Sequence, residues 1–143
     1  MIDLANNEAR HLAIVHRHMI KLLDRQLVPL DLGHGRYLYL FRLYNADGEK
    51  QQELADIIGA DKAAATRALA RLEKAGLVRR QPDKEDRRAT RVYLTRKAQA
   101  LRPRLEAALE ESVQSFTSVL NDKERGQLKK LLAKIAAPLT PGH

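Results

Sequence analysis

The sequence contains no cysteine among its 143 residues. It therefore forms no disulfide and offers no thiol redox switch, cysteine nucleophile or thiolate metal site. Long apolar runs are also missing, because pairs such as Ile57-Ile58 and Leu77-Val78 are followed by charge within a few residues. That pattern excludes a membrane-spanning helix of about 20 residues. Residues 1–8 lack the basic start and apolar middle of a secretion signal, so we expect a cytoplasmic protein.

The motifs of common enzyme classes are missing as well. The sequence has no Gly-rich phosphate loop, no Gly-x-Ser-x-Gly turn and no paired-histidine motif. We therefore predict a protein that is not an enzyme and carries no cofactor. His11, His16, His18 and His34 raise the question of a metal site, but His11 and His18 lie almost two helical turns apart, and His16 and His18 point in different directions. We predict no metal site.

Charge is distributed unevenly along the chain. The net charge is +8, and residues 62–104 hold 14 Lys and Arg against 4 Asp and Glu, whereas the rest holds 12 against 14. A charge run is commonly a solvated surface, but one window that carries the whole excess favours a polyanionic partner. Nucleic acid is favoured over an anionic membrane, because no lysine-rich amphipathic helix with bulky aromatic anchors accompanies the window.

The composition allows one domain spanning residues 1–143, with 44% hydrophobic residues to build a core. The sequence predicts amphipathic helices at both ends of the chain. Residues 6–28 place apolar side chains at spacings of three and four: Leu12, Val15, Met19, Leu22, Leu23 and Leu27. After Thr95, a good N-cap, the chain returns to helix, with a kink expected near Pro103. A last helix opens at Asn121 or Asp122 and carries an apolar stripe of Leu128, Leu131, Leu132 and Ile135.

The middle of the chain, residues 36–95, alternates short helices with turn signals. Residues 36–45 are compatible with strand or helix by composition, and we interpret them as a buried helix. A turn at Asp47-Gly48 precedes a helix over 51–58, which ends at Gly59. Asp61 is a good N-cap for a second helix over 62–75. Two strands, 77–81 and 89–94, then flank a charged loop over 82–88.

This order predicts a mainly helical fold with a small β-hairpin, the winged helix-turn-helix. A helix fits the major groove of B-DNA, where side chains reach base edges and flanking cations reach phosphates. Arginine on a protruding hairpin suits the narrow minor groove, whose negative potential attracts a guanidinium. The terminal helices hold more apolar residues than such a lobe could cover, so we expect residues 6–28 and 96–137 to form a homodimer interface.

Three runs carry a resemblance to a known family: residues 52–58 (QELADII), residues 66–80 (TRALARLEKAGLVRR), and Asp86-Arg87-Arg88 followed by Leu94-Thr95. They resemble the MarR family of bacterial transcriptional regulators, whose wing signature is Asp-x-Arg, five variable residues and Leu-Thr. The resemblance covers nearly the whole chain. It implies a homodimer that binds a palindromic operator in double-stranded DNA and often releases it when a small phenolic or anionic effector binds.

By this resemblance, Thr66 and Arg67 lie on the recognition helix, and Asp86 orients Arg88 toward the minor groove. Two departures stand out. Glu49-Lys50-Gln51 replaces the Ser or Thr that usually caps the helix before the turn, and no glycine follows Leu94-Thr95 closely. The predicted DNA-binding residues are Lys62, Ala63, Ala64, Thr66, Arg67, Arg71, Asp86, Arg87 and Arg88.

An aromatic cluster between residues 36 and 45 leaves two interpretations open. Core packing explains it without a ligand. The alternative is an effector pocket between the dimerisation helices and the DNA-binding lobe, in which an arginine pairs with a carboxylate and a tyrosine stacks. The predicted pocket residues are His34, Arg36, Tyr37 and Arg42. A winged helix that binds RNA or protein without operator specificity is the alternative function, but the basic window holds only Tyr93 for base stacking.

Overall fold

The computed structural model describes residues 1–141. Within them, six α-helices and one antiparallel hairpin follow each other along the chain: α1 (Glu8–Leu27), α2 (Arg36–Asn45), α3 (Gln51–Ile58), α4 (Lys62–Lys74), β1 (Val78–Pro82), β2 (Thr90–Leu94), α5 (Arg96–Thr117) and α6 (Asp122–Ala136). Single 3₁₀ turns, Val28–Leu30 and Ala137–Leu139, follow α1 and α6. The mainly helical winged helix-turn-helix predicted from the sequence is confirmed.

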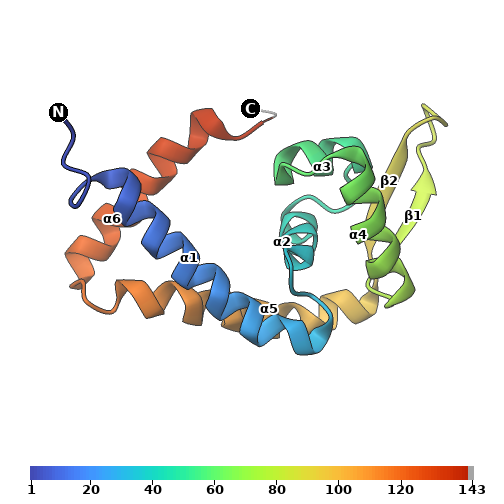
Figure 1. Ribbon diagram of the computed structural model, residues 1–143. Coiled ribbons are helices and arrows are strands. Elements are labelled where there is room, and N and C mark those ends of the chain that lie inside the picture. Colours follow the sequence, from blue (N-terminus) through green and yellow to red (C-terminus); the bar gives the residue numbers. More distant parts are fainter. Residues whose placement is uncertain (142–143) are drawn as a thin grey trace.

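The two longest helices, α1 and α5, run side by side and form the long axis of the molecule (Figure 1). Helices α2, α3 and α4 and the hairpin gather at one end of this axis. From the other end, α6 turns back from α5 (Figure 1). The lobe of residues 36–95 is thus spatially distinct from the terminal helices, although α1 and α5 both enter its core.

Most predicted helix ends match the observed caps. Thr95 accepts a hydrogen bond from the Ala98 amide at 3.2 Å, and Asn121 forms a capping box with Glu124. The first helix ends at Leu27, one residue earlier than expected, because Pro29 cannot donate to an α-helical hydrogen bond and the chain tightens into a 3₁₀ turn. Helix α5 continues through Pro103 as one helix.

The strands differ from the prediction by one residue each. The first strand begins at Val78, because Leu77 still belongs to the C-cap of α4. Gly76 adopts φ +76°, and the Leu77 amide donates to the Leu72 carbonyl at 2.9 Å. It extends to Pro82, which pairs with Thr90. Val78 pairs with Leu94, so Val92 and Leu94 point into the core.

A single core joins the lobe to the inner halves of the long helices. Its fully buried side chains come from five of the helices, the hairpin and the loop before α2: Leu23, Leu27, Leu32, Tyr37, Leu40, Leu43, Leu54, Leu69, Leu72, Val78, Val92 and Leu105. Tyr37 is 2% exposed and packs edge-to-face on Phe41, with ring centres 5.5 Å apart. Tyr39 is buried too, so these tyrosines belong to the core.

The apolar stripe of α6 is uncovered in the single chain. Leu131 is 56% exposed and Ile135 60% exposed, and α6 has no buried side chain. On α1, Leu12 and Ile14 are exposed in the same way. Among residues 1–141, no helix has the length and apolar character needed to cross a bilayer.

Candidate nucleic-acid interface

Helices α3 and α4 form the helix-turn-helix through three local features. Gly59 ends α3 with φ +82°, a conformation that favours glycine. After the turn, the Asp61 carboxylate accepts from the Ala64 amide at 2.7 Å and caps α4. Gln51 of α3 donates to the Thr66 hydroxyl at 3.2 Å. The first turn of α3 is therefore joined to the second turn of α4.

One face of α4 is buried and the opposite face is free. Ala65, Leu69 and Leu72 pack inward, whereas Lys62, Ala63 and Arg67 are exposed. Among the residues that the structure describes, Arg67 forms no ion pair. Thr66 is also exposed, but its hydroxyl donates to the Lys62 carbonyl at 2.8 Å, and Ala64 is half-buried. Of these predicted residues, Lys62 and Arg67 are therefore the long side chains that are exposed and without an ion pair among the described residues.

Arg71 lies on the flank of α4 and already has a partner. Its guanidinium donates to both carboxylate oxygens of Asp31, at 2.8 and 3.0 Å. Arg36 donates to the same carboxylate at 3.2 Å. The hydrogen bond from Arg71 and the charges of both arginines lower the pKa of Asp31. Arg71 thus connects the recognition helix to the loop after α1.

The wing presents its arginines differently. Asp86 accepts from both the amide and the Nε of Arg88, at 3.1 and 3.3 Å, while the Arg88 side chain remains 95% exposed. Arg87 is exposed beside it. Aspartate and arginine are therefore placed as the wing signature requires: the acid contacts the base of the guanidinium, and its outer nitrogens remain free.

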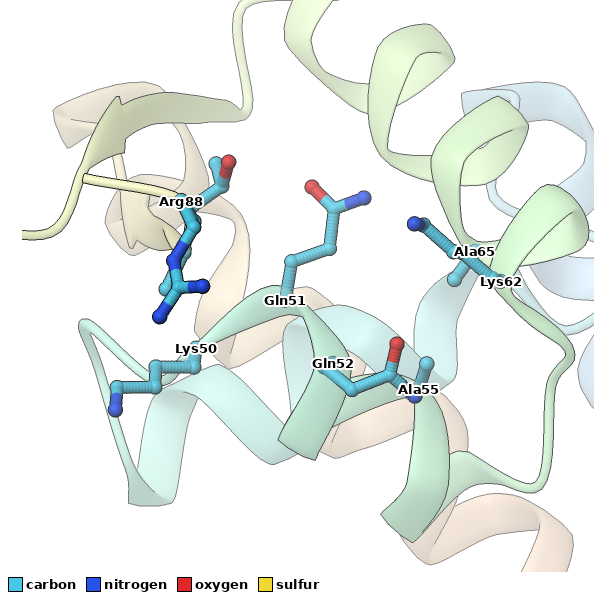
Figure 2. Close-up of a pocket in the computed structure, with 9 residues that line it drawn as sticks. Lys50, Gln51, Gln52, Ala55, Lys62, Ala65 and Arg88 are labelled. Carbon is cyan, nitrogen blue, oxygen red and sulfur yellow. The ribbon is translucent and has the colours of Figure 1, made fainter. Parts of the chain in front are cut away.

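A hollow of about 180 Å³ lies between α3, α4 and the wing. Gln51 points into it from α3, with Arg88 and Lys50 on one side and Lys62 on the other (Figure 2). Three cations and no carboxylate line this hollow. Lys50, Gln51 and Gln52 were not predicted as site residues from the sequence. The one signal at the N-terminus of α3 was the absence of a Ser or Thr cap. Lys50 precedes α3 without a side-chain capping bond.

The predicted effector residues are occupied by contacts within the chain. Tyr37 is in the core, and the His34 amide donates to Asp24 at 3.1 Å. Arg36 is bound to Asp31, and Arg42 forms two hydrogen bonds of 2.8 Å with Glu49. Arg42 lines a separate hollow whose other residues are mostly acidic or apolar: Glu49, Glu53, Asp56, Ile57 and Pro141. An effector pocket built from these residues stays a prediction.

Comparison with known proteins identifies the family. The model of the MarR family matches residues 32–90. A MarR transcriptional regulator from Methanosarcina mazei Go1 is 30% identical, superposes with a TM-score of 0.84, and covers 89% of this chain and 91% of its own. The chain belongs to the MarR family of transcriptional regulators.

Other relatives match this MarR-family regulator over more than nine tenths of its length. The uncharacterized HTH-type transcriptional regulator YybA of Bacillus subtilis (strain 168) is 28% identical over 91% of this chain and 87% of its own. A putative MarR family transcriptional regulator from Listeria monocytogenes, solved in complex with a 26mer DNA, is 26% identical, with a TM-score of 0.82, over 94% of this chain and 89% of its own.

The four histidines within residues 1–141 of this MarR-family regulator are dispersed. Within residues 1–141, no group of three His, Asp or Glu side chains is placed to hold a metal ion. His11, His16 and His18 lie along α1, whereas His34 lies in the loop before α2.

Proposed function

We propose that this regulator binds a pseudo-palindromic operator in double-stranded DNA as a homodimer and represses transcription there. The observation that carries the proposal is the hollow shared by the recognition helix and the wing, in which Lys62 and Arg88 face one space without an intervening carboxylate. Two elements that suit different grooves of B-DNA therefore present cations to the stretch of backbone between those grooves. A protein with this role acts in the cytoplasm, where bacterial DNA lies.

Each element has a distinct task on the duplex. Arg67, on the outward face of α4, is free to take a guanine edge with both arms of its guanidinium in the major groove. Arg88, held at its base by Asp86, enters the adjacent minor groove. Lys50 and Lys62 flank the hollow, where a backbone phosphate fits between them.

The uncovered apolar side chains support the homodimer. Leu131, Leu132 and Ile135 form an exposed stripe on α6, although each has the character of a core residue. A second copy related by a two-fold axis buries the same stripe twice. The two recognition helices then meet successive major grooves, about 10 base pairs apart.

The proposal includes release of the operator DNA when an effector binds. Asp31 holds Arg36 and Arg71 at once, and Arg71 lies on the recognition helix. A small aromatic or otherwise anionic molecule whose carboxylate takes Arg36 changes the contacts of the same aspartate that holds Arg71. Ligand binding near residues 34–37 is thereby transmitted to α4, since only one carboxylate separates the two arginines.

Selection of bound duplexes from a random pool tests the proposal. We expect a symmetric site with half-sites about one turn apart, steep weakening of binding with salt, and weaker enrichment when aromatic acids are present. Placing the selected site in a promoter should lower transcription when the protein is supplied. Equal binding to single strands, RNA and unrelated duplexes would instead support the alternative of a winged helix without operator specificity.

A further inference from the structure

The base of the wing contains an ion pair between a buried aspartate and a partly exposed arginine, and this pair makes no contact with the outward face of α4. Asp83 is 6% exposed, and its carboxylate accepts from the Nε of Arg91 at 2.7 Å. The second oxygen of Asp83 accepts from the Asp86 amide at 3.3 Å. Arg91 also donates to the Gly48 carbonyl at 2.8 Å. One ion pair therefore contacts both the tip of the wing and the body of the lobe.

On the side of the tip, these contacts lead to the exposed arginine. Asp86 has its amide on Asp83 and its carboxylate on the amide and Nε of Arg88. The Asp83 amide donates to the Ala89 carbonyl at 2.9 Å and closes the loop from below. Arg88 itself is bonded in the chain only at its amide and Nε, among the contacts of the described residues. Its direction thus depends on Asp86. The position of Asp86 depends on Asp83, which accepts from its amide, and on the Ala89 amide, which donates to its carbonyl at 2.9 Å.

On the side of the body, Gly48 belongs to a segment that is firmly held. Its amide donates to the Val92 carbonyl at 2.9 Å, and Glu49, the next residue, is held by the two arms of Arg42. Gly48 has φ +79°, and a Cβ at this position would lie 2.8 Å from the Tyr93 ring. Only glycine fits there without a shift. Arg91 therefore connects the wing by a hydrogen bond to the Gly48-Glu49 segment, which is in turn held by Arg42 of α2.

The wing tip has no apolar core that could replace these polar contacts. Between Asp83 and Ala89, the side chains of Lys84, Glu85 and Arg87 are exposed. A carboxylate buried without a partner is unfavourable, so Asp83 stabilises the loop only while Arg91 is in place. Arg91 is one of the cations of the basic window, yet its charge is compensated by Asp83. It is an internal contact of the wing.

We propose that Asp83 and Arg91 are positioning residues that set the direction of the wing and, through Asp86, how deeply Arg88 enters the minor groove. This proposal rests on the proposed function. It assigns to the ion pair of Asp83 and Arg91 the preference for A·T base pairs that a minor-groove arginine produces, since narrow A·T-rich grooves attract a guanidinium only when it enters them.

A double-substitution experiment with two DNA probes tests it. Asp83→Asn keeps the size of the side chain and removes its charge, and Arg88→Ala removes the inserted group. Affinities of the wild type, both single variants and the double variant are measured at fixed salt for the selected operator. The same affinities are then measured for a copy in which the A·T pairs under the wing are replaced by G·C.

We expect Asp83→Asn to bind the operator about tenfold more weakly and to lose most of the A·T preference, because a lost charge-assisted hydrogen bond misdirects the arginine. The double variant should bind no more weakly than Arg88→Ala alone. If the two effects multiply and Asp83→Asn keeps the wild-type A·T preference, the pair has only a structural role and the proposal is wrong.

Two further variants make the outcome decisive. Glu85→Gln removes the same charge from the same loop at an exposed side chain, and it should leave the A·T preference unchanged. Arg91→Lys keeps the charge but cannot reach Asp83 and Gly48 together, and it replaces Asp83→Asn if that variant melts below the assay temperature. If the wild type selects no site in the first place, the proposed function fails, and this failure is distinct from the failure of the pair.

Discussion

The winged-helix lobe of residues 36–95 and the terminal helices have the same amphipathic pattern, with opposite results. In α4, Leu69 and Leu72 lie at helical spacing and are fully buried. In α6, Leu131, Leu132 and Ile135 have similar spacing and are exposed. The lobe folds around its own apolar residues, whereas α6 presents them outward. An apolar stripe therefore predicts a helix, and the rest of the chain decides whether that helix is already packed or still needs a partner.

The two regions differ in charge as well. The lobe holds most of the basic window, but several of its arginines are bonded internally, including Arg42 to Glu49, Arg80 to Glu73 and Arg91 to Asp83. Lys62, Arg67, Arg87 and Arg88 are among the cations that extend outward. Counting cations in the sequence therefore overestimates the number of side chains available to DNA.

Truncating the core of the lobe should have the largest effect. Leu69→Ala removes a fully buried side chain and should lower the free energy of unfolding by about 2–5 kcal/mol. Urea denaturation measures the loss. Ala63→Gly, on the exposed face of the same helix, is the control and should cost only about 1 kcal/mol from helix propensity. Equal losses in both variants would contradict the assignment of the core.

Placing a charge on the α6 stripe should break the dimer and leave the lobe folded. Burial of a leucine contributes about 1.5–3 kcal/mol, and the substitution occurs twice in a two-fold dimer, so Leu131→Lys should raise the dimer dissociation constant at least roughly a hundredfold. Sedimentation velocity measures the change. Ala133→Lys adds the same charge on the opposite side of α6 and should leave the dimer intact.

Within the lobe, the free arginines should differ in how they affect base preference. Arg67→Ala should weaken operator binding by about 1–3 kcal/mol and relax the preference at one base position in each half-site. Arg87→Ala removes the same charge from the exposed wing. It should weaken binding to all duplexes alike and reduce the slope of log affinity against log salt concentration by about one unit. Competition binding with single-base operator variants separates the two outcomes. An unchanged base preference in Arg67→Ala would show that Arg67 contacts the DNA phosphate backbone and not a base edge.

Acid should loosen the lobe before the terminal helices, and this is the smallest effect we expect. Hydrogen bonds from Arg71, Arg80 and Arg91 lower the pKa values of Asp31, Glu73 and Asp83, respectively. A carboxyl group whose pKa is lower in the folded chain stabilises the fold above its unfolded pKa of about 4, and this contribution is lost as the pH falls below that value.

Near-ultraviolet circular dichroism measures this change selectively, because all four tyrosines, Tyr37, Tyr39, Tyr44 and Tyr93, lie in the lobe. The tyrosine signal should decline between about pH 4 and 2 while the far-ultraviolet helical signal persists. A tyrosine signal that strengthens with acid would have the wrong sign for lowered pKa values.

Local signals in the sequence predicted most of the fold. The caps at Asp61, Thr95 and Asn121, the glycines at 59 and 76, and the spacing of apolar residues placed each helix within about two residues. The exposed position of Arg67 also follows from spacing along one helix, whereas the contact between Asp86 and Arg88 was implied by the resemblance to the wing signature of the MarR family. The contact between Arg71 and Asp31 could not be predicted, because 40 residues separate them in the chain.

By itself, the sequence determined which segments become helix or strand and which side of each segment is apolar, since these properties depend on neighbours within about four residues. It also determined the basic excess that points to DNA. Only the tertiary structure decided which charges remain free. The pair of Asp83 and Arg91 forms within the hairpin, but the hydrogen bond from Arg91 to the Gly48 carbonyl exists only once the hairpin has packed beside residues 46–50. Pairing over such sequence distances follows from packing, which no local pattern encodes.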